Sequence, residues 1–162
     1  MTKIATAVPS ELSARFTAVT EYFGGEGQTL RVRARDGADL VLKILPVGVE
    51  PAEASLLLSL RHPAIPAVRE VGRLDDGRAF VVRDHVEGDP LRTLPRAHDE
   101  LLATLRQLLE VLAYVHLRGV LHLDLKPANL LRDRRGELHL LDFGLAVRGG
   151  IAGRGGTPDR KS

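Results

Sequence analysis

The chain has 162 residues, of which 44% are hydrophobic and 27% charged, and these proportions are typical of a globular protein with one domain or two small lobes. The absence of cysteine excludes a disulfide framework and a thiolate metal site. A net charge of +2 with only 4% aromatic residues does not favour nucleic-acid binding. We find neither a secretory signal nor an apolar run of membrane-spanning length, so we expect no membrane association and a cytoplasmic location.

The first part of the chain is expected to contain a β-hairpin. Residues 1–20 are predicted to be a polar, weakly helical lead-in. Residues 29–35 (TLRVRAR) alternate apolar and basic side chains, and residues 39–45 (DLVLKIL) read as a second strand. The Asp36-Gly37 pair between them is a turn signal.

A short helix and a second hairpin are expected next. Residues 50–62 (EPAEASLLLSLRH) place apolar side chains at helical spacing, with Pro51 near the start and Pro63 just beyond the end. Residues 67–86 contain two strand-like runs on either side of an Asp-Asp-Gly turn.

The second half of the chain is expected to begin with a long amphipathic helix. Between residues 99 and 117, leucine and valine recur every three or four positions, and Gly119 is placed to end the helix. Residues 137–143 (ELHLLDF) predict a short strand, and glycine becomes frequent from Arg148 onward. The order of elements predicts an α+β fold with two lobes joined near residues 87–90.

Four polar residues stand out because they lie in apolar surroundings: Lys43, Asp124, Asn129 and Asp142. Lysine is rare in this chain, which has 19 arginines and four lysines, and Asn129 is the sole asparagine. Because a lysine is a compact point charge and an arginine a planar fork, an internal lysine in such a sequence indicates a site that needs the former.

Three segments carry a resemblance to a known family. The stretches VLKIL (41–45), HLDLKPANLL (122–131) and LDFGLA (141–146), in this order, resemble the protein kinase family, and DLKPAN is similar to its Ser/Thr branch. The resemblance extends over residues 22–158. It implies a bilobal kinase-like fold: a lead-in (1–20), a β-rich N-lobe (21–88) and an abbreviated helical C-lobe (89–162) that ends in the activation segment.

The resemblance implies an ATP-dependent kinase acting on Ser/Thr hydroxyls of a protein substrate, with Mg²⁺ as the metal. By this resemblance, Asp124 orients the substrate hydroxyl and accepts its proton, and Lys126 steadies the transferred phosphoryl group. Asn129 and Asp142 would hold Mg²⁺ through oxygen ligands. His122 is expected to be a packed structural residue.

Further residues are assigned to ATP binding on the same basis. Lys43 would hold the α- and β-phosphates with Glu53 as its acidic partner, although Glu53 is also explained as a first-turn acid of its own helix. Arg83 would lie at the back of the pocket. The remaining assignments are Gly25 and Gly27 in the glycine loop, the side chains of Val32, Val41 and Leu131 around the base, and the main chain of Asp84 and Val86 beside adenine. Leu57, Val68, His122 and Phe143 are expected to stack into a column between the lobes.

The sequence departs from the family pattern at several places. The glycine loop lacks its third glycine, Leu123 stands where the family has arginine, and Arg83 is charged where an apolar residue is usual. The chain stops before the helices that normally follow, so the leucine-rich face of the long helix is expected to be partly uncovered. Either a partner chain covers it, or the protein is a truncated product of marginal stability. Two alternatives are a catalytically weak nucleotide-binding or scaffold module and a small-molecule phosphotransferase; Lys126 argues against the second.

Overall fold

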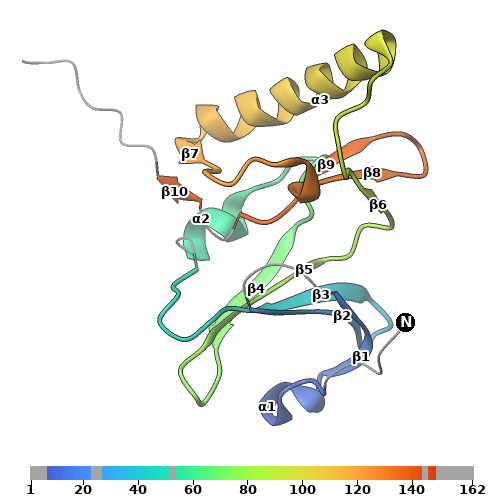
Figure 1. Cartoon of the computed structure of the whole chain (residues 1–162). Helices are drawn as coiled ribbons and strands as arrows, with labels where there is room; N and C mark the ends of the chain where they lie inside the picture. Colours follow the sequence, from blue (N-terminus) through green and yellow to red (C-terminus); the bar gives the residue numbers. More distant parts are fainter. Residues whose placement is uncertain (1–6, 23–26, 52–53, 144–145, 149–162) are drawn as a thin grey trace, which may run out of the picture.

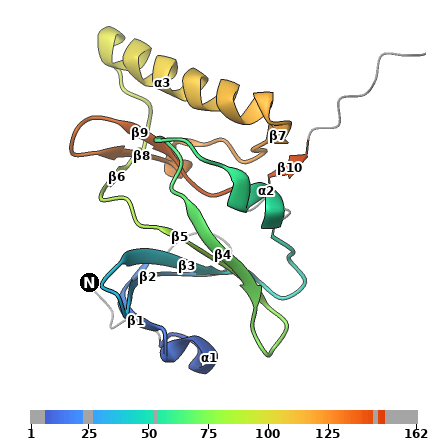
Figure 2. The ribbon, with the colours of Figure 1, turned by 180° about the vertical axis from the view of Figure 1, so that it is seen from behind.

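The computed structural model of the protein describes residues 7–22, 27–51, 54–143 and 146–148. It has two layers of elements that face each other (Figure 1). A β-sheet with a short helix below it forms the N-lobe, and a long helix lying over short strands forms the second lobe. The view from behind shows helix α2 between the sheet and the long helix (Figure 2).

The N-lobe sheet is antiparallel throughout, in the order β1-β2-β3-β5-β4. Its strands are β1 (Phe16–Tyr22), β2 (Gln28–Ala34), β3 (Asp39–Ile44), β4 (Val68–Arg73) and β5 (Ala79–Asp84). Both predicted hairpins are confirmed. In the first, the Asp36 side chain accepts a hydrogen bond from the Ala38 N–H, and Gly37 has a φ of 88°, which favours glycine.

The expectation of a helical lead-in over residues 1–20 is corrected for residues 7–20, while residues 1–6 lie outside the described residues. Within it, α1 (Ser10–Ser13) is a single turn of helix, and strand β1 already begins at Phe16. The edge strand β1 looks polar because Thr17, Thr20 and Glu21 interrupt its apolar residues. Phe16 is 6% exposed and packs with Leu12 against the sheet, and this burial favours a strand over continued helix.

Two clusters of buried side chains lie on opposite faces of the sheet. The outer cluster fills the space between the sheet and α1, and it comprises Val8, Leu12, Phe16, Leu30, Val32, Leu40, Leu42, Ile44, Leu74, Phe80 and Val82. The inter-lobe cluster joins α2 and β4 to the second lobe, and it includes Leu57, Leu60, Val68, Val111, Val115, Leu140 and Phe143. The cleft-facing side of the sheet is therefore the side that carries Lys43.

The second lobe confirms the predicted long helix, α3 (His98–Leu117), which Gly119 follows with a φ of 69°. Helix α2 (Ala54–Ser59) is shorter than the expected 50–62. Strands β6 (Gly88–Pro90), β8 (Leu130–Asp133) and β9 (Leu138–Leu140) form a three-stranded sheet, and β7 (Val120–Leu121) pairs with β10 (Val147–Arg148). The one-turn 3₁₀ helix η1 (Pro127–Asn129) precedes β8.

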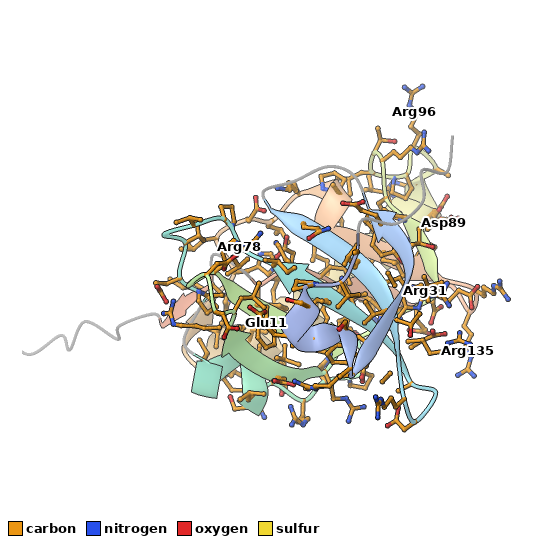
Figure 3. The ribbon with its side chains drawn as sticks, turned by 90° about the horizontal axis from the view of Figure 1, so that it is seen from below. Glu11, Arg31, Arg78, Asp89, Arg96 and Arg135 are labelled. Carbon is orange, nitrogen blue, oxygen red and sulfur yellow. The ribbon has the colours of Figure 1, made fainter. Side chains whose placement is uncertain are left out.

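The arginines are spread over the surface. Arg78, Arg96 and Arg135 lie far apart from one another in Figure 3. Several others form local ion pairs: Arg15–Glu70, Arg69–Asp84, Arg73–Glu50, Arg106–Glu110 and Arg134–Glu87. Among the described residues, none of the helices combines the length and the apolarity that crossing a membrane requires.

Candidate active site

The loop between β7 and β8 holds its polar side chains together. Asn129 Nδ2 donates to the main-chain oxygen of Asp124 at 2.8 Å and to its Oδ2 at 2.9 Å. Lys126 Nζ lies 2.7 Å from the same Oδ2. The bond from Lys126, supported by that from Asn129, lowers the pKa of Asp124 below its ordinary value, against the opposing effect of burial. The carboxylate is therefore kept ionised, as a group that accepts a proton must be.

The loop is anchored to the segment that carries Asp142. His122 is 3% exposed, its Nε2 lies 2.9 Å from the Leu141 carbonyl, and the Asp124 N–H donates to its Nδ1 at 3.3 Å. Because a carbonyl only accepts, Nε2 is the donor of this bond, and Nδ1 is the acceptor of the Asp124 N–H. The Leu141 N–H donates in turn to the Asn129 carbonyl at 2.8 Å. These bonds place Asp142 beside the loop that carries Asp124 and Asn129.

Lys43 and Asp142 are in direct contact across the two lobes. Lys43 Nζ lies 2.6 Å from both carboxylate oxygens, and the two side chains are 22% and 33% exposed. The sequence predicted both residues for one site but not this ion pair. Asp142 and Leu123 have φ values of 58° and 61°, a conformation that non-glycine residues rarely adopt and that is concentrated at functional sites.

The predicted column between the lobes is present. Leu57, Val68 and Phe143 belong to the inter-lobe cluster, and the rings of His122 and Phe143 are 4.7 Å apart in an edge-to-face arrangement. The column fixes the position of Phe143 and hence of Asp142 next to it. His122 packs in the way expected of a structural residue.

The back of the cleft is a small cavity of about 40 Å³ between the lobes. Side chains from both lobes line it, among them Lys43, Leu57, Val68, Arg83, Asp142 and Phe143. Arg83 is therefore where the sequence placed it. Burial lowers its pKa, while the Asp142 carboxylate acts in the opposite direction.

The assignment of Val32 to the base pocket is wrong by one residue. Val32 is fully buried in the outer cluster, on the face of the sheet opposite to Lys43. Arg31 pairs with Val41 in the β2–β3 register and so lies on the cleft side, where it bonds Asp39 at 2.9 Å. A shift of one residue along a strand moves a side chain to the other face.

Of the other residues assigned to the base pocket, Val41 lies within β3 and Leu131 on β8, next to β6. Val41 and Leu131 are buried, and a Cβ on Gly88 would lie 2.5 Å from Leu131 Cδ2, so β6 passes close over this leucine. The Asp84 N–H donates to the Ala67 carbonyl within the sheet.

Val86 lies in the connection between the lobes and is half-buried. Beside it, the Tyr22 hydroxyl lies 3.0 Å from His85 Nε2. This contact ties the end of β1 to the connection, a link that the sequence did not indicate.

Three assignments concern the glycine loop and the acidic partner. Gly25 and Glu53 lie outside the described residues. Gly27 has a φ of 84°, and a Cβ there would lie 2.2 Å from the Ile44 carbonyl oxygen. The close approach of β2 to β3 therefore requires a glycine at this position for a structural reason.

The donor atoms at the site fit a magnesium ion. Asp142 supplies carboxylate oxygens and Asn129 an amide oxygen, which are the ligands that this hard cation takes. The Asn129 amide nitrogen is already engaged with Asp124, so the oxygen is the end of the side chain left for a metal. Lys43 beside Asp142 supplies a cation for phosphate oxygens.

Comparisons with known proteins agree with this geometry. Residues 24–153 match the protein kinase domain, so the chain belongs to the protein kinase family. It is 41% identical over 101 residues to cyclin-dependent kinase G1 of Arabidopsis thaliana, which covers 58% of this chain and 16% of that protein. It is 38% identical over 109 residues to a probable serine/threonine-protein kinase of Streptomyces coelicolor, which covers 62% and 16%.

A third relative matches over a longer stretch. CBL-interacting protein kinase 16 of Oryza sativa subsp. japonica is 33% identical over 133 residues, which covers 78% of this chain and 29% of that protein. The chain thus spans less than a third of the length of each of these three relatives. Its β-rich sheet and long helix correspond to a kinase N-lobe and part of a C-lobe.

Proposed function

We propose that the chain transfers the γ-phosphoryl group of ATP to a serine or threonine hydroxyl of a protein substrate. The observation that carries this proposal is the convergence of Lys43, Asp124, Asn129 and Asp142, from both lobes, through direct bonds and the main chain of Leu141. The matches to serine/threonine kinases support the same reaction.

Each residue has a step that its surroundings allow. The ionised Asp124 carboxylate takes the proton from the substrate hydroxyl, whose oxygen bonds to the γ-phosphorus as the bond to the ADP oxygen breaks. Lys126 lies 2.7 Å from Asp124 and faces the same space, so it can stabilise the charge on the transferred group. Mg²⁺ on Asn129 and Asp142 would supply charge neutralisation for the phosphates.

The Lys43–Asp142 pair has a consequence for nucleotide binding. Lys43 is expected to contact phosphates, and Asp142 to hold the metal. Because Lys43 Nζ lies 2.6 Å from both Asp142 oxygens, phosphate and metal would compete with this contact when a nucleotide binds. The pair thus keeps two charges compensated between the lobes until phosphate and metal take over.

Transfer of labelled phosphate tests the proposal. Purified chain with Mg²⁺ and γ-labelled ATP is expected to label a Ser/Thr-containing protein, and Asp124→Asn to abolish labelling while ATP still binds. Asp89→Asn, which removes an exposed acid on β6, is the matched control and is expected to behave as wild type. ATP binding without any transfer by the wild type would instead support the nucleotide-binding scaffold.

We also propose that a protein partner binds to α3. Leu102 and Leu109 on this helix are 52% and 65% exposed and lie in the same open, apolar patch of its surface. If a second copy is the partner, wild type will sediment as a heavier species than Leu109→Glu. Equal masses would exclude a second copy.

We further propose a cytoplasmic location for the protein. Fractionation of cells that express the chain tests this location.

A further inference from the structure

We propose that Arg83 selects the nucleobase. With arginine at this position, the cleft binds triphosphates of 6-oxo purines, such as guanine and hypoxanthine, more tightly relative to ATP than it would with an apolar residue. The proposal deepens the proposed function and rests on it. It follows from the position of the guanidinium at the inner end of the cleft, bonded to the main-chain carbonyl that the base is expected to use.

The sheet register directs Arg83 into the cleft. Arg83 on β5 pairs with Val41 on β3, and the next pair on the same face joins Lys43 to Val81. Side chains of directly paired residues lie on the same face of a sheet, so Arg83 and Lys43 are diagonal neighbours. Both line the cavity of about 40 Å³ together with Asp142.

The guanidinium donates a hydrogen bond to a main-chain carbonyl at this end of the cleft. Arg83 Nη1 donates to the Asp84 carbonyl oxygen at 3.2 Å. The Asp84 main chain is the group assigned to the base, and its N–H is already bonded to Ala67 within the sheet. A 6-amino group of adenine that approached this carbonyl would share it with the arginine.

The hydrogen-bonding groups of arginine then determine which base binds more tightly. A guanidinium has several donors and no acceptor, so it disfavours the donor 6-amino group of adenine and favours an acceptor oxygen at the same position. Arginine pairs in this way with O6 and N7 of guanine in DNA. The carbonyl keeps a second lone pair, so ATP is weakened rather than excluded.

The charge on Arg83 persists in the described structure. Burial lowers its pKa, but Asp142, Tyr22 and Asp84 act in the opposite direction, and the ordinary value for arginine is so high that the side chain stays protonated. An apolar residue here would leave the Asp84 carbonyl to the adenine amino group alone.

The experiment compares the affinities of three nucleotides for three proteins. Calorimetry gives Kd for ATP, GTP and ITP, each with Mg²⁺, for wild type, Arg83→Met and Arg106→Met. ITP has the 6-oxo group without the 2-amino group of GTP, so it isolates the contact in question. Arg106 is an exposed arginine on α3, paired with Glu110, and controls for the loss of one positive charge.

The expected result is a change in the ratio of affinities. Arg83→Met is expected to shift the ratio of Kd for GTP to Kd for ATP by about tenfold in favour of ATP, with ITP following GTP. Arg106→Met should leave both ratios unchanged. An unchanged ratio in Arg83→Met, or ITP that behaves like ATP, would overturn the proposal while leaving the proposed function intact.

Two further results keep the test decisive. If Arg83→Met does not fold, Arg83→Gln replaces it, and because glutamine both donates and accepts, an intermediate ratio is expected. If no triphosphate binds to wild type, the proposed function itself fails, and the inference about Arg83 fails with it.

Discussion

Lys43 and Asp142 are predicted to be energetically coupled in the nucleotide-free protein. The perturbation is a double-mutant cycle of Lys43→Met, Asp142→Ala and the double variant. The cycle isolates the term between the two side chains, and any other contact that Asp142 makes cancels from it.

The expected size follows from the burial of the pair. Exposed ion pairs contribute about 0.2–1 kcal/mol, and removing one partner of a fully buried pair costs about 3–5 kcal/mol. Lys43 and Asp142 are 22% and 33% exposed and make two contacts of 2.6 Å. With an allowance for solvent screening, we expect a coupling free energy of about 1–2 kcal/mol.

Urea unfolding without nucleotide or metal measures this coupling. The pair Arg106–Glu110 is the matched control, because its side chains are 82% and 60% exposed, and its coupling should be below about 0.5 kcal/mol. A coupling for Lys43 and Asp142 as small as that of the control would show that the two charges do not depend on one another, contrary to this prediction.

Three further predictions test the packing and the pH dependence. Val32→Ala should lower the free energy of unfolding by about 1–3 kcal/mol and leave the Kd for Mg·ATP unchanged. Unchanged stability with a weaker Kd would instead indicate that the Val32 side chain contacts the nucleotide. Gly72→Ala should destabilise by about 1–3 kcal/mol, because a Cβ would lie 2.5 Å from Phe80 Cζ, and an unchanged Tm would contradict this contact. Burial, aided by the charge of a nearby arginine, lowers the pKa of His62 in the folded protein. As the pH falls below about 6.5, the unfolded chain is therefore protonated at this histidine before the folded chain is. The free energy of unfolding decreases until the pH has passed the folded pKa. His62→Asn keeps an acceptor for the Ala64 N–H and should flatten this part of the stability profile in urea unfolding at several pH values; a profile identical to wild type would exclude His62 as its source.

Much of the site could be predicted from local sequence because the motifs lie in segments with strong patterns. The spacing of leucines gave the bounds of α3 within one residue, and the polar residues after it fell in one loop. Asp124, Lys126 and Asn129 lie within six residues, so η1 and the start of β8 bring them together without long-range information.

The contacts across the lobes could not be predicted in this way. Lys43 and Asp142 are 99 residues apart, and their direct pairing depends on how the two lobes pack. The strand β6 also escaped prediction, because Gly88 and Pro90 are poor strand residues and the strand exists only by pairing with β8.

The position of Val32 is a different case, because the sequence contained the information. Asp36-Gly37 fixes the turn of the first hairpin, and counting outward from it places Arg31 opposite Val41 and Thr29 opposite Lys43. The assignment of Val32 followed the family resemblance instead. Register from the turn is the stronger signal, because the hydrogen-bonding of a hairpin enforces it.

We propose that residues of both lobes form one metal–nucleotide site. Calorimetric titration of wild type and Asp142→Asn with ATP, with and without Mg²⁺, tests it most directly. We predict that Mg²⁺ tightens ATP binding to wild type by at least about tenfold and that the variant loses this gain. Equal gains in both proteins, or no dependence on Mg²⁺ in wild type, would show that Asp142 does not hold the metal of a shared site.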